Sequence, residues 1–347
     1  MESTDLNLTQ VSPAELETAL DFFIANKMPA LIVGPPGCGK TAIMRQRIAH
    51  AGAEERFFDA VISDVTDYKG FPAKDGDRAK WIPFDDLRIL FEATKPTVAV
   101  FDDFGQATPQ QQAPAMQLWG SGRIGDFKIS EYVTFLMASN RKEDFAGVSG
   151  ILEPVKSRNY TILELLSNAN DWSRWAIKDG QPMDLIQFVR FSETRDNNWL
   201  TNFKPSRDMV NSPCARTIAH VGEMINKGIP ESIKWAAIAG AAGNEFAIQY
   251  RGFLEIYNKV PSPDLIILNP DAVDVPDETR PDLLYAVCGA LAYKSNENNF
   301  ENIVKYVERL PAEFQILFMK DVKLINEDLQ KTGVYINWAS KNHNIYI

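Results

Sequence analysis

The most constraining feature of the chain is the segment at residues 34–41, which reads Gly-Pro-Pro-Gly-Cys-Gly-Lys-Thr. It fits the pattern G-x-x-x-x-G-K-[ST] at every fixed position. An apolar run at residues 28–34 leads into it, and a segment with helical spacing at residues 40–50 follows it. Strand, glycine-rich turn and helix in this order predict a parallel α/β sheet with an anion site at the turn.

The residue types of this turn suit a triphosphate. Glycine lets the backbone wrap around an anion with its N–H groups pointing inward, and the start of the next helix adds a positive dipole end. Lys40 would reach the outer phosphates, and the Thr41 hydroxyl would hold Mg²⁺. Cys38 stands at a variable position of the pattern, so we interpret it as a packing residue. The predicted phosphate-binding set is Gly34, Pro35, Pro36, Gly37, Cys38, Gly39, Lys40, Thr41 and Ala42.

A second motif supplies carboxylates. Residues 98–101 are apolar, and Asp102 and Asp103 follow them directly. Open α/β sheets place their ligands at the carboxyl ends of strands, where these two side chains would emerge. We expect Asp102 to bind Mg²⁺ directly or through water, and Asp103 to polarise the attacking water. The two motifs together favour hydrolysis of a nucleoside triphosphate over binding alone.

Composition limits the partners and the compartment. The net charge is −10, from 46 acidic and 36 basic residues, which disfavours a nucleic-acid partner without excluding one, since a ring can line a pore with few basic groups. The three cysteines, Cys38, Cys214 and Cys288, lie far apart and predict a reducing compartment with neither disulfides nor zinc. Because no apolar run reaches the length of a membrane span and the first residues do not resemble a signal peptide, we expect a cytoplasmic protein without a membrane segment.

The periodicity of the chain changes near its middle. Strand-like runs alternate with helical segments up to residue 166, whereas residues 167–347 have mostly helical spacing. The sequence therefore predicts an α/β nucleotide-binding core at 1–166 and a helical lid with a C-terminal helical extension at 167–347. Expected strands are residues 28–34, 57–62, 97–101, 131–138 and 160–165, and the long helical segments are 185–191, 215–225, 231–257, 282–293, 300–310 and 312–329.

From Asp102 onward the chain resembles one family. The run Asp-Asp-Phe-Gly-Gln-Ala at residues 102–107, followed by a glutamine-rich helix at 109–119, is similar to the D-E-I-N-R-A segment of MoxR-type AAA+ ATPases. Residues 63–83 resemble the segment that precedes it in that family. That family belongs to a group with a hairpin inserted in the second helix, and residues 120–129 resemble this hairpin. The resemblance covers about two-thirds of the chain and implies a P-loop AAA+ core that uses ATP and Mg²⁺.

The resemblance also implies roles for three further residues. Asn140 matches the sensor-1 residue that orients water against the γ-phosphate. Arg158 matches the arginine finger that reaches a neighbouring subunit's site, although Arg141 is an alternative. Arg216 matches the sensor-2 arginine of the lid, with Arg207 as its alternative. ATP in place of GTP rests on the resemblance, and the sequence has no N-K-x-D motif for guanine.

Two positions depart from the family. Asp103 stands where the family usually has glutamate, and its side chain is one methylene shorter, which puts the rate of hydrolysis in doubt. Gln106 replaces a basic residue near an expected subunit interface. Neither change affects the residues expected to bind nucleotide.

The expected function is that of an ATPase subunit in a homo-oligomeric, typically hexameric, ring. MoxR-type proteins are thought to remodel partner proteins, often ones with a von Willebrand factor A domain, so a chaperone-like remodeller is the leading hypothesis. A nucleic-acid-handling motor such as a helicase or a McrB-like protein, a slow ATP-gated scaffold, and a small-molecule kinase are the alternatives.

Overall fold

The computed structural model describes residues 9–342 except positions 65, 125, 145, 196, 205–207 and 258–259. These residues form two compact units. One is an α/β unit formed by residues up to Ser167 together with Lys204, and the other is a helical unit formed by residues 168–203 and 208 onward. Each unit has its own hydrophobic core.

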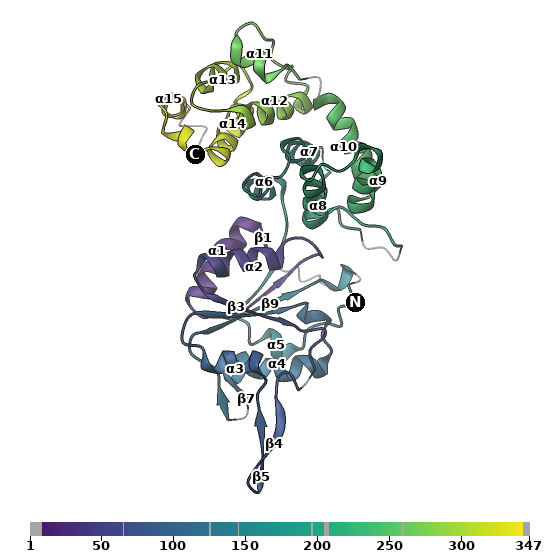
Figure 1. Cartoon of the computed structure of the whole chain (residues 1–347), viewed down its shortest axis with the longest axis vertical. Helices are drawn as coiled ribbons and strands as arrows, with labels where there is room; N and C mark the ends of the chain where they lie inside the picture. Colours follow the sequence, from purple (N-terminus) through teal and green to yellow (C-terminus); the bar gives the residue numbers. More distant parts are fainter. Residues whose placement is uncertain are drawn as a thin grey trace, which may run out of the picture. The chain divides into compact units, whose positions relative to one another are not determined.

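The α/β unit is built on a six-stranded parallel sheet (Figure 1). The strands lie in the order β1-β10-β2-β9-β6-β3, and every neighbouring pair is parallel. Their bounds are β1 Thr9–Val11, β2 Ala30–Val33, β3 Glu54–Asp59, β6 Thr97–Asp102, β9 Val133–Ser139 and β10 Thr161–Leu165. All carboxyl ends therefore meet at one edge of the sheet, and all amino ends meet at the other.

Helices cover both faces of this sheet, so its central strands are apolar on both sides. Helices α1 Pro13–Ala25 and α2 Lys40–His50 lie on one face, and α3 Asp85–Glu92, α4 Pro109–Ser121 and α5 Glu153–Lys156 lie on the other (Figure 1). Alternate residues of β6 serve the two layers. Val98 and Val100 belong to the core under α1 and α2, whereas Ala99 and Phe101 belong to the core over α3 and α4.

Two hairpins extend from the α/β unit. Strands β7 Arg123–Ile124 and β8 Phe127–Lys128 form a short hairpin within residues 120–129, as expected. It follows α4, however, which is the third helix of the core when counted from α2. The hairpin that precedes the second core helix, α3, is the longer pair β4 Phe71–Asp75 and β5 Arg78–Ile82, which projects from the unit (Figure 1). Assigning residues 120–129 to a second-helix insertion was therefore wrong.

The helical unit contains two clusters of buried side chains, one from α6–α10 with Ala286 of α12 and one from α11–α15. A buried ion pair links α7 and α14, in which Arg190 donates to both carboxylate oxygens of Asp321 at 2.6 and 2.9 Å. The helices are α6 Ala169–Lys178, α7 Met183–Glu193, α8 Ala215–Asn226, α9 Glu231–Ala242, α10 Asn244–Tyr257, α11 Pro263–Leu268, α12 Pro281–Lys294, α13 Phe300–Val307, α14 Ala312–Ile325 and α15 Gly333–Lys341. In the described ranges, no helix has both the length and the apolar character needed to cross a bilayer.

Some element bounds differ from the predicted ones for clear reasons. The strand expected at residues 57–62 spans Glu54–Asp59, because its charged first residues lie at the sheet edge in ion pairs such as Arg56–Glu54. The long helix expected at 231–257 is divided at Gly243, whose φ of 92° breaks helical geometry. The proline-rich stretch at residues 261–281, outside the predicted helical segments, contains the short helix α11 Pro263–Leu268.

Candidate nucleotide site

The phosphate-binding turn lies between β2 and α2, at the carboxyl edge of the sheet. Gly37 and Gly39 have φ values of 74° and 106°, which L side chains rarely adopt. Gly34 has a close neighbour instead, since a Cβ on it would lie 3.1 Å from the carbonyl oxygen of Leu165 on β10. These glycines therefore meet two separate requirements of the turn, backbone curvature and close approach to the next strand.

Lys40 is buried and its ammonium group lies over the turn. Nζ donates to the carbonyl oxygens of Gly34 and Pro35 at 2.9 and 3.1 Å, and to Asn140 Oδ1 at 2.9 Å. An ammonium group has three N–H donors, and these three oxygens use all of them. Phosphate oxygens would therefore have to replace some of these acceptors when a nucleotide binds.

Thr41 and Asp102 provide the oxygen ligands that Mg²⁺ prefers. Thr41 Oγ1 donates to the two carboxylate oxygens of Asp102 at 3.0 and 3.2 Å. Over the described parts of the chain, no group of three or more His, Cys, Asp or Glu residues forms a metal cage. This hydroxyl–carboxylate pair fits Mg²⁺, which is usually held by one or two protein oxygens, by waters and by the phosphates of its nucleotide.

Asn140 joins Lys40 to Asp103. It directly follows β9, is buried, and donates from Nδ2 to Asp103 Oδ1 at 2.9 Å while Oδ1 accepts from Lys40. Asp103 has left-handed backbone angles, with φ 50° and ψ 31°, a conformation that costs a non-glycine residue free energy. This turn of the chain directly after β6 places the Asp103 carboxylate against Asn140. Sequence reasoning named all three residues, and the fold brings them together.

Arg141, the alternative candidate for the arginine finger, forms its ion pairs within its own chain. Its guanidinium pairs with Asp144 at 2.7 Å and with Glu164 of β10 at 3.1 Å, and both carboxylates are buried. The hydrogen bonds from Arg141 to Asp144 are the main reason why the pKa of Arg141 lies above its ordinary value. These contacts give Arg141 a structural place beside the turn.

Arg158 lies at the opposite edge of the sheet from the phosphate-binding turn. It stands two residues beyond the end of α5 and three before β10, so it belongs to the amino edge. Its side chain is exposed, packs over Gly120 of α4 and donates to the carbonyl oxygen of Pro154 at 2.6 Å. Among the described residues it has no ion-pair partner. The strands are four to seven residues long in the sheet centre, or about 13–23 Å at ~3.3 Å per residue, so Arg158 lies far from Lys40 of its own chain.

The sensor-2 candidates belong to the second unit or lie outside the description. Arg216 is exposed in the first turn of α8, within the helical unit. Arg207 lies outside the described residues. The role of Arg216 toward nucleotide stays a prediction.

One supporting residue escaped the sequence reasoning. Ser167 is buried, and its Oγ donates to the carbonyl oxygen of Cys38 in the turn at 2.9 Å. The two residues lie 129 positions apart, so no local pattern could reveal the contact. Cys38 itself is buried against Gly34, in agreement with a packing role.

The order of the strands defines the class of P-loop fold to which the α/β unit belongs. Without β1, the sheet reads β10-β2-β9-β6-β3, which is 5-1-4-3-2 when the strands are counted along the chain. The phosphate-binding turn follows the first of these strands and the two aspartates follow the third. This is a P-loop core of the AAA+ class, followed by a helical C-terminal part.

Comparisons with known proteins add little beyond this class. No protein-family model matches the sequence, and no curated protein matches it either. Similar solved structures include a mutant of RuvB from Thermotoga maritima, with 14% identity, 74% of each chain covered and a TM-score of 0.39. A structure described as the Thermotoga maritima RuvB Holliday junction branch migration motor has 13% identity, covers 70% of this chain and 68% of its own, and has a TM-score of 0.37. NtrX from Brucella abortus has 12% identity, with 96% of this chain and 65% of its own covered and a TM-score of 0.35.

Proposed function

We propose that this chain is an ATPase of the MoxR type that works as one subunit of a ring and remodels partner proteins. The observation that carries the proposal is the continuous set of contacts from Lys40 through Asn140 to Asp103, beside the Thr41–Asp102 pair. A site that only bound nucleotide would have no need of a carboxylate aligned by a buried amide. Such a carboxylate suits the activation of water.

Each residue has a definite task in this proposal. Lys40 and the N–H groups of the turn bind the β- and γ-phosphates, and Thr41 and Asp102 hold Mg²⁺, whose charge neutralises the phosphates when it is bound. Asp103 accepts a hydrogen bond from the attacking water and orients it toward the γ-phosphate. Asn140 fixes the Asp103 carboxylate, and with Lys40 it links the water site to the phosphate site.

Arg158 would act on the nucleotide of a neighbouring subunit. Its exposed guanidinium at the amino edge has no ion-pair partner among the described residues, and it cannot reach the turn of its own chain. A guanidinium that enters the neighbour's site spreads transition-state charge and makes hydrolysis depend on assembly. Arg216 would carry the loss of the γ-phosphate to the helical lid, and thus convert hydrolysis into a movement of that unit.

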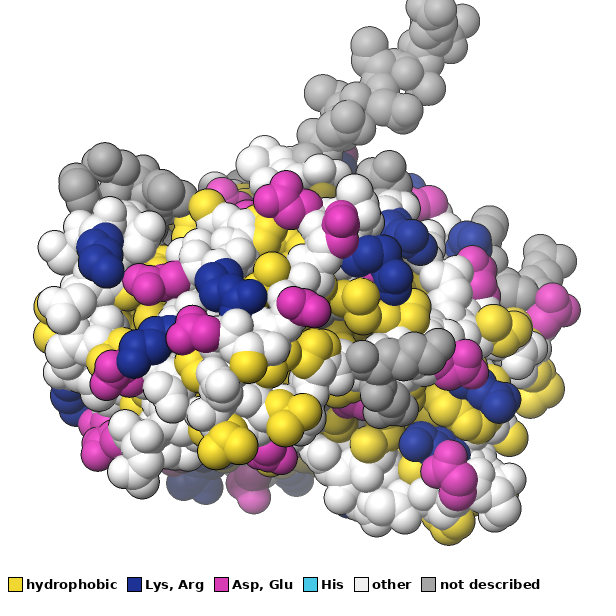
Figure 2. All heavy atoms as spheres, turned by 90° about the horizontal axis from the view of Figure 1, so that it is seen from above, with side chains coloured by type: hydrophobic (Ala, Val, Ile, Leu, Met, Phe, Trp, Pro, Cys, Tyr) yellow, Lys and Arg dark blue, Asp and Glu magenta, His cyan; other side chains and the backbone are white. Residues whose placement is uncertain are grey.

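Remodelling of a protein is favoured over movement along nucleic acid by the charge of the chain. The net charge is −10, and on the face drawn in Figure 2 basic side chains are scattered among acidic ones without a broad basic patch among the described residues. A phosphate backbone needs clustered cations. We propose as client a protein with a von Willebrand factor A domain, by resemblance to the family. A slow ATP-gated scaffold is the second candidate, because the short Asp103 stands where the family has glutamate.

The test is ATP hydrolysis at rising protein concentration with Mg²⁺, for the wild type and Asp103→Asn. The proposal predicts that specific activity rises with concentration and that Asp103→Asn binds Mg-ATP but loses at least about a hundredfold in rate. If the wild type binds Mg-ATP but hydrolyses it no faster than Asp103→Asn at any concentration, the chain is a scaffold. Pull-down of a von Willebrand factor A domain protein by the ATP-bound Asp103→Asn form would test the client.

A further inference from the structure

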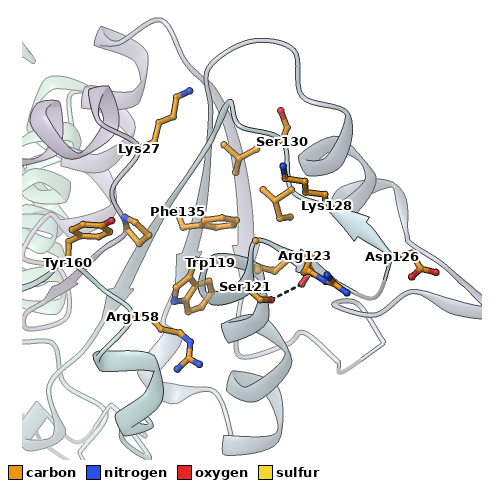
Figure 3. Close-up of a pocket in the computed structure, with 15 residues that line it drawn as sticks. Lys27, Trp119, Ser121, Arg123, Asp126, Lys128, Ser130, Phe135, Arg158 and Tyr160 are labelled. Atoms are coloured by element: carbon orange, nitrogen blue, oxygen red, sulfur yellow. Dashed lines mark hydrogen bonds between the residues drawn. The ribbon is translucent and has the colours of Figure 1, made fainter.

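A cavity of about 660 Å³ lies at the amino edge of the sheet, between α4, the β7–β8 hairpin and the residues just before β2 and β10. We call it the amino-edge pocket (Figure 3). Pro29 and Tyr160 mark the edge, since each directly precedes a strand. The volume is in the range of pockets that hold a drug-sized ligand or a few side chains of a partner.

The pocket is cationic in an acidic protein. Its lining has a net charge of +3, from four basic side chains and one acidic side chain, namely Lys27, Arg123, Lys128 and Arg158 against Asp126. None of the four cations forms an ion pair with another described residue. The whole chain has a net charge of −10, so this concentration of unpaired positive charge attracts an anionic group.

The walls of the pocket are aromatic. Trp119 and Phe135 lie side by side in its wall, with Arg158 close to Trp119 (Figure 3). Tyr160 is 69% exposed and presents its ring at the border. A partner that fills this pocket should therefore carry both acidic groups and an apolar side chain.

The carboxyl edge of the same sheet presents a segment with those properties. Residues 59–64 and 66–67, which we call the acidic loop, contain three aspartates and no basic residue. Ile62 is 81% exposed and Val61 is 41% exposed. Exposing the apolar Ile62 side chain to water costs free energy. An isoleucine flanked by aspartates suits a cationic pocket with aromatic walls.

The acidic loop is held in place before any partner arrives. Gln111 of α4 donates to the carbonyl oxygens of Val61 and Ser63 at 3.2 and 2.7 Å. Asp64 accepts from the Thr66 backbone and hydroxyl at 2.9 and 2.8 Å, and these bonds hold the pKa of Asp64 below its ordinary value. A loop that is already ordered loses little entropy on binding, and Asp64 stays ionised at neutral pH.

The loop and the pocket cannot meet within one chain, because they lie at opposite edges of the sheet. The acidic loop begins at Asp59, whose strand pairs with β6 so that Asp59 lies opposite Asp102 at the carboxyl edge. Contact between two copies would be heterologous, with a different surface from each copy. Such contacts close into rings when the rotation between copies permits.

We propose that the acidic loop of one subunit docks into the amino-edge pocket of the next, with Ile62 against the aromatic wall and the aspartates against the four cations. This inference rests on the proposed ring and names the surfaces that build it. Docking brings Arg158 of one subunit to the carboxyl edge of its neighbour, beside the strand end that carries Asp102. The same pocket therefore both joins subunits and positions Arg158 as a finger.

Disulfide trapping tests the contact directly. Mixed Ile62→Cys and Tyr160→Cys subunits, mildly oxidised with Mg-ATP, should give a covalent dimer, and the double variant in one chain should give a ladder of oligomers. The three native cysteines are buried and should not form disulfides under these conditions. Ile248→Cys, at a site on α10 that is 72% exposed, is the matched control in place of Ile62→Cys and should give no ladder.

Sedimentation separates this inference from the function it rests on. Ile62→Lys should weaken assembly at least about tenfold, while Ile248→Lys leaves it unchanged. Lys128→Asp should also weaken assembly, and combining it with Asp64→Lys should restore part of it. Unchanged Mg-ATP binding by each monomer shows that the variants fold. If the wild type assembles and Ile62→Lys assembles equally well, the docking is overturned and the ring stands. A wild type that stays monomeric with Mg-ATP overturns both.

Discussion

Asn140 donates a hydrogen bond to Asp103 at 2.9 Å, and this contact joins the ends of two neighbouring strands of the sheet. Asp103 follows β6, Asn140 follows β9, and the two strands are paired in parallel. The amide therefore has one fixed direction, with its oxygen toward Lys40 and its nitrogen toward the carboxylate. A carboxylate held in this way has little freedom, which suits a group that must align water.

Replacing Asn140 with alanine should separate binding from hydrolysis. Lys40 keeps its contacts to the turn, so we expect the Kd for Mg-ATP to change by less than about fivefold. The Asp103 carboxylate loses its orientation, so kcat should fall at least about thirtyfold. Binding of a fluorescent ATP analogue and steady-state hydrolysis measure the two effects. An Asn140→Ala variant with a normal kcat would show that Asp103 needs no alignment from this amide.

Gly120 provides a test of Arg158 that leaves the arginine itself in place. A Cβ at Gly120 would lie 2.3 Å from Arg158 Nε, so Gly120→Ala should push the guanidinium aside. Alanine favours a helix over glycine by up to about 1 kcal/mol, so the Tm of the variant should not fall. We expect lower hydrolysis at concentrations where the wild type assembles, together with unchanged Mg-ATP binding. Gly252→Ala in α10, where a Cβ meets no atom within 4 Å, is the control. Equal hydrolysis in both variants would contradict the proposed position of Arg158.

Because Asp184 is buried, we expect the stability of the helical unit to depend on pH. Burial raises the pKa of Asp184 above its ordinary value of 3.8, although Tyr250 donates a hydrogen bond to its carboxylate at 3.1 Å. A carboxyl with a raised folded-state pKa contributes stability below pH 3.8 that is lost as the pH rises through the folded-state pKa. Asp184→Asn avoids this loss and keeps an oxygen for Tyr250.

We therefore expect Asp184→Asn to have a higher free energy of unfolding than the wild type at pH 7, and the difference to vanish below pH 3.8. Urea unfolding at several pH values checks this, with Asp271→Asn on the exposed surface as control. A variant that is less stable than the wild type at pH 7 would show that the charged form of Asp184 is the favoured one.

The parts of the site that the sequence predicted are those with a local signal. The turn at Gly34 and the aspartates after β6 are short patterns whose spacing is fixed by the chemistry of a phosphate and a metal. Asn140 follows an apolar strand, and it was predicted from its resemblance to the sensor-1 residue of MoxR-type proteins. The contact of Asn140 with both motifs, in contrast, depends on β9 lying between β2 and β6, an order that no local pattern encodes.

Other features escaped prediction for physical reasons. The β4–β5 hairpin is exposed on both faces and contains Pro72, so its residues do not alternate between buried and exposed. The short edge strand β1 has only three residues. Ser167 and Cys38 meet through the tertiary fold alone. Local sequence patterns thus predicted the residues that would bind phosphate and metal. The hairpin, the edge strand and the contact between Ser167 and Cys38 could be identified only in the folded chain.

The most direct test of the ring mechanism is to mix two inactive variants. Lys40→Ala should lose the phosphate contact and Arg158→Ala should lose the finger, so each alone should hydrolyse ATP at least about a hundredfold more slowly than the wild type. Random mixing of equal amounts places an intact Lys40 beside a neighbour's intact Arg158 at about one interface in four. The account predicts that the mixture regains about a quarter of wild-type turnover at concentrations where the wild type assembles. A mixture no more active than its two components, or an Arg158→Ala variant with full activity, would contradict it.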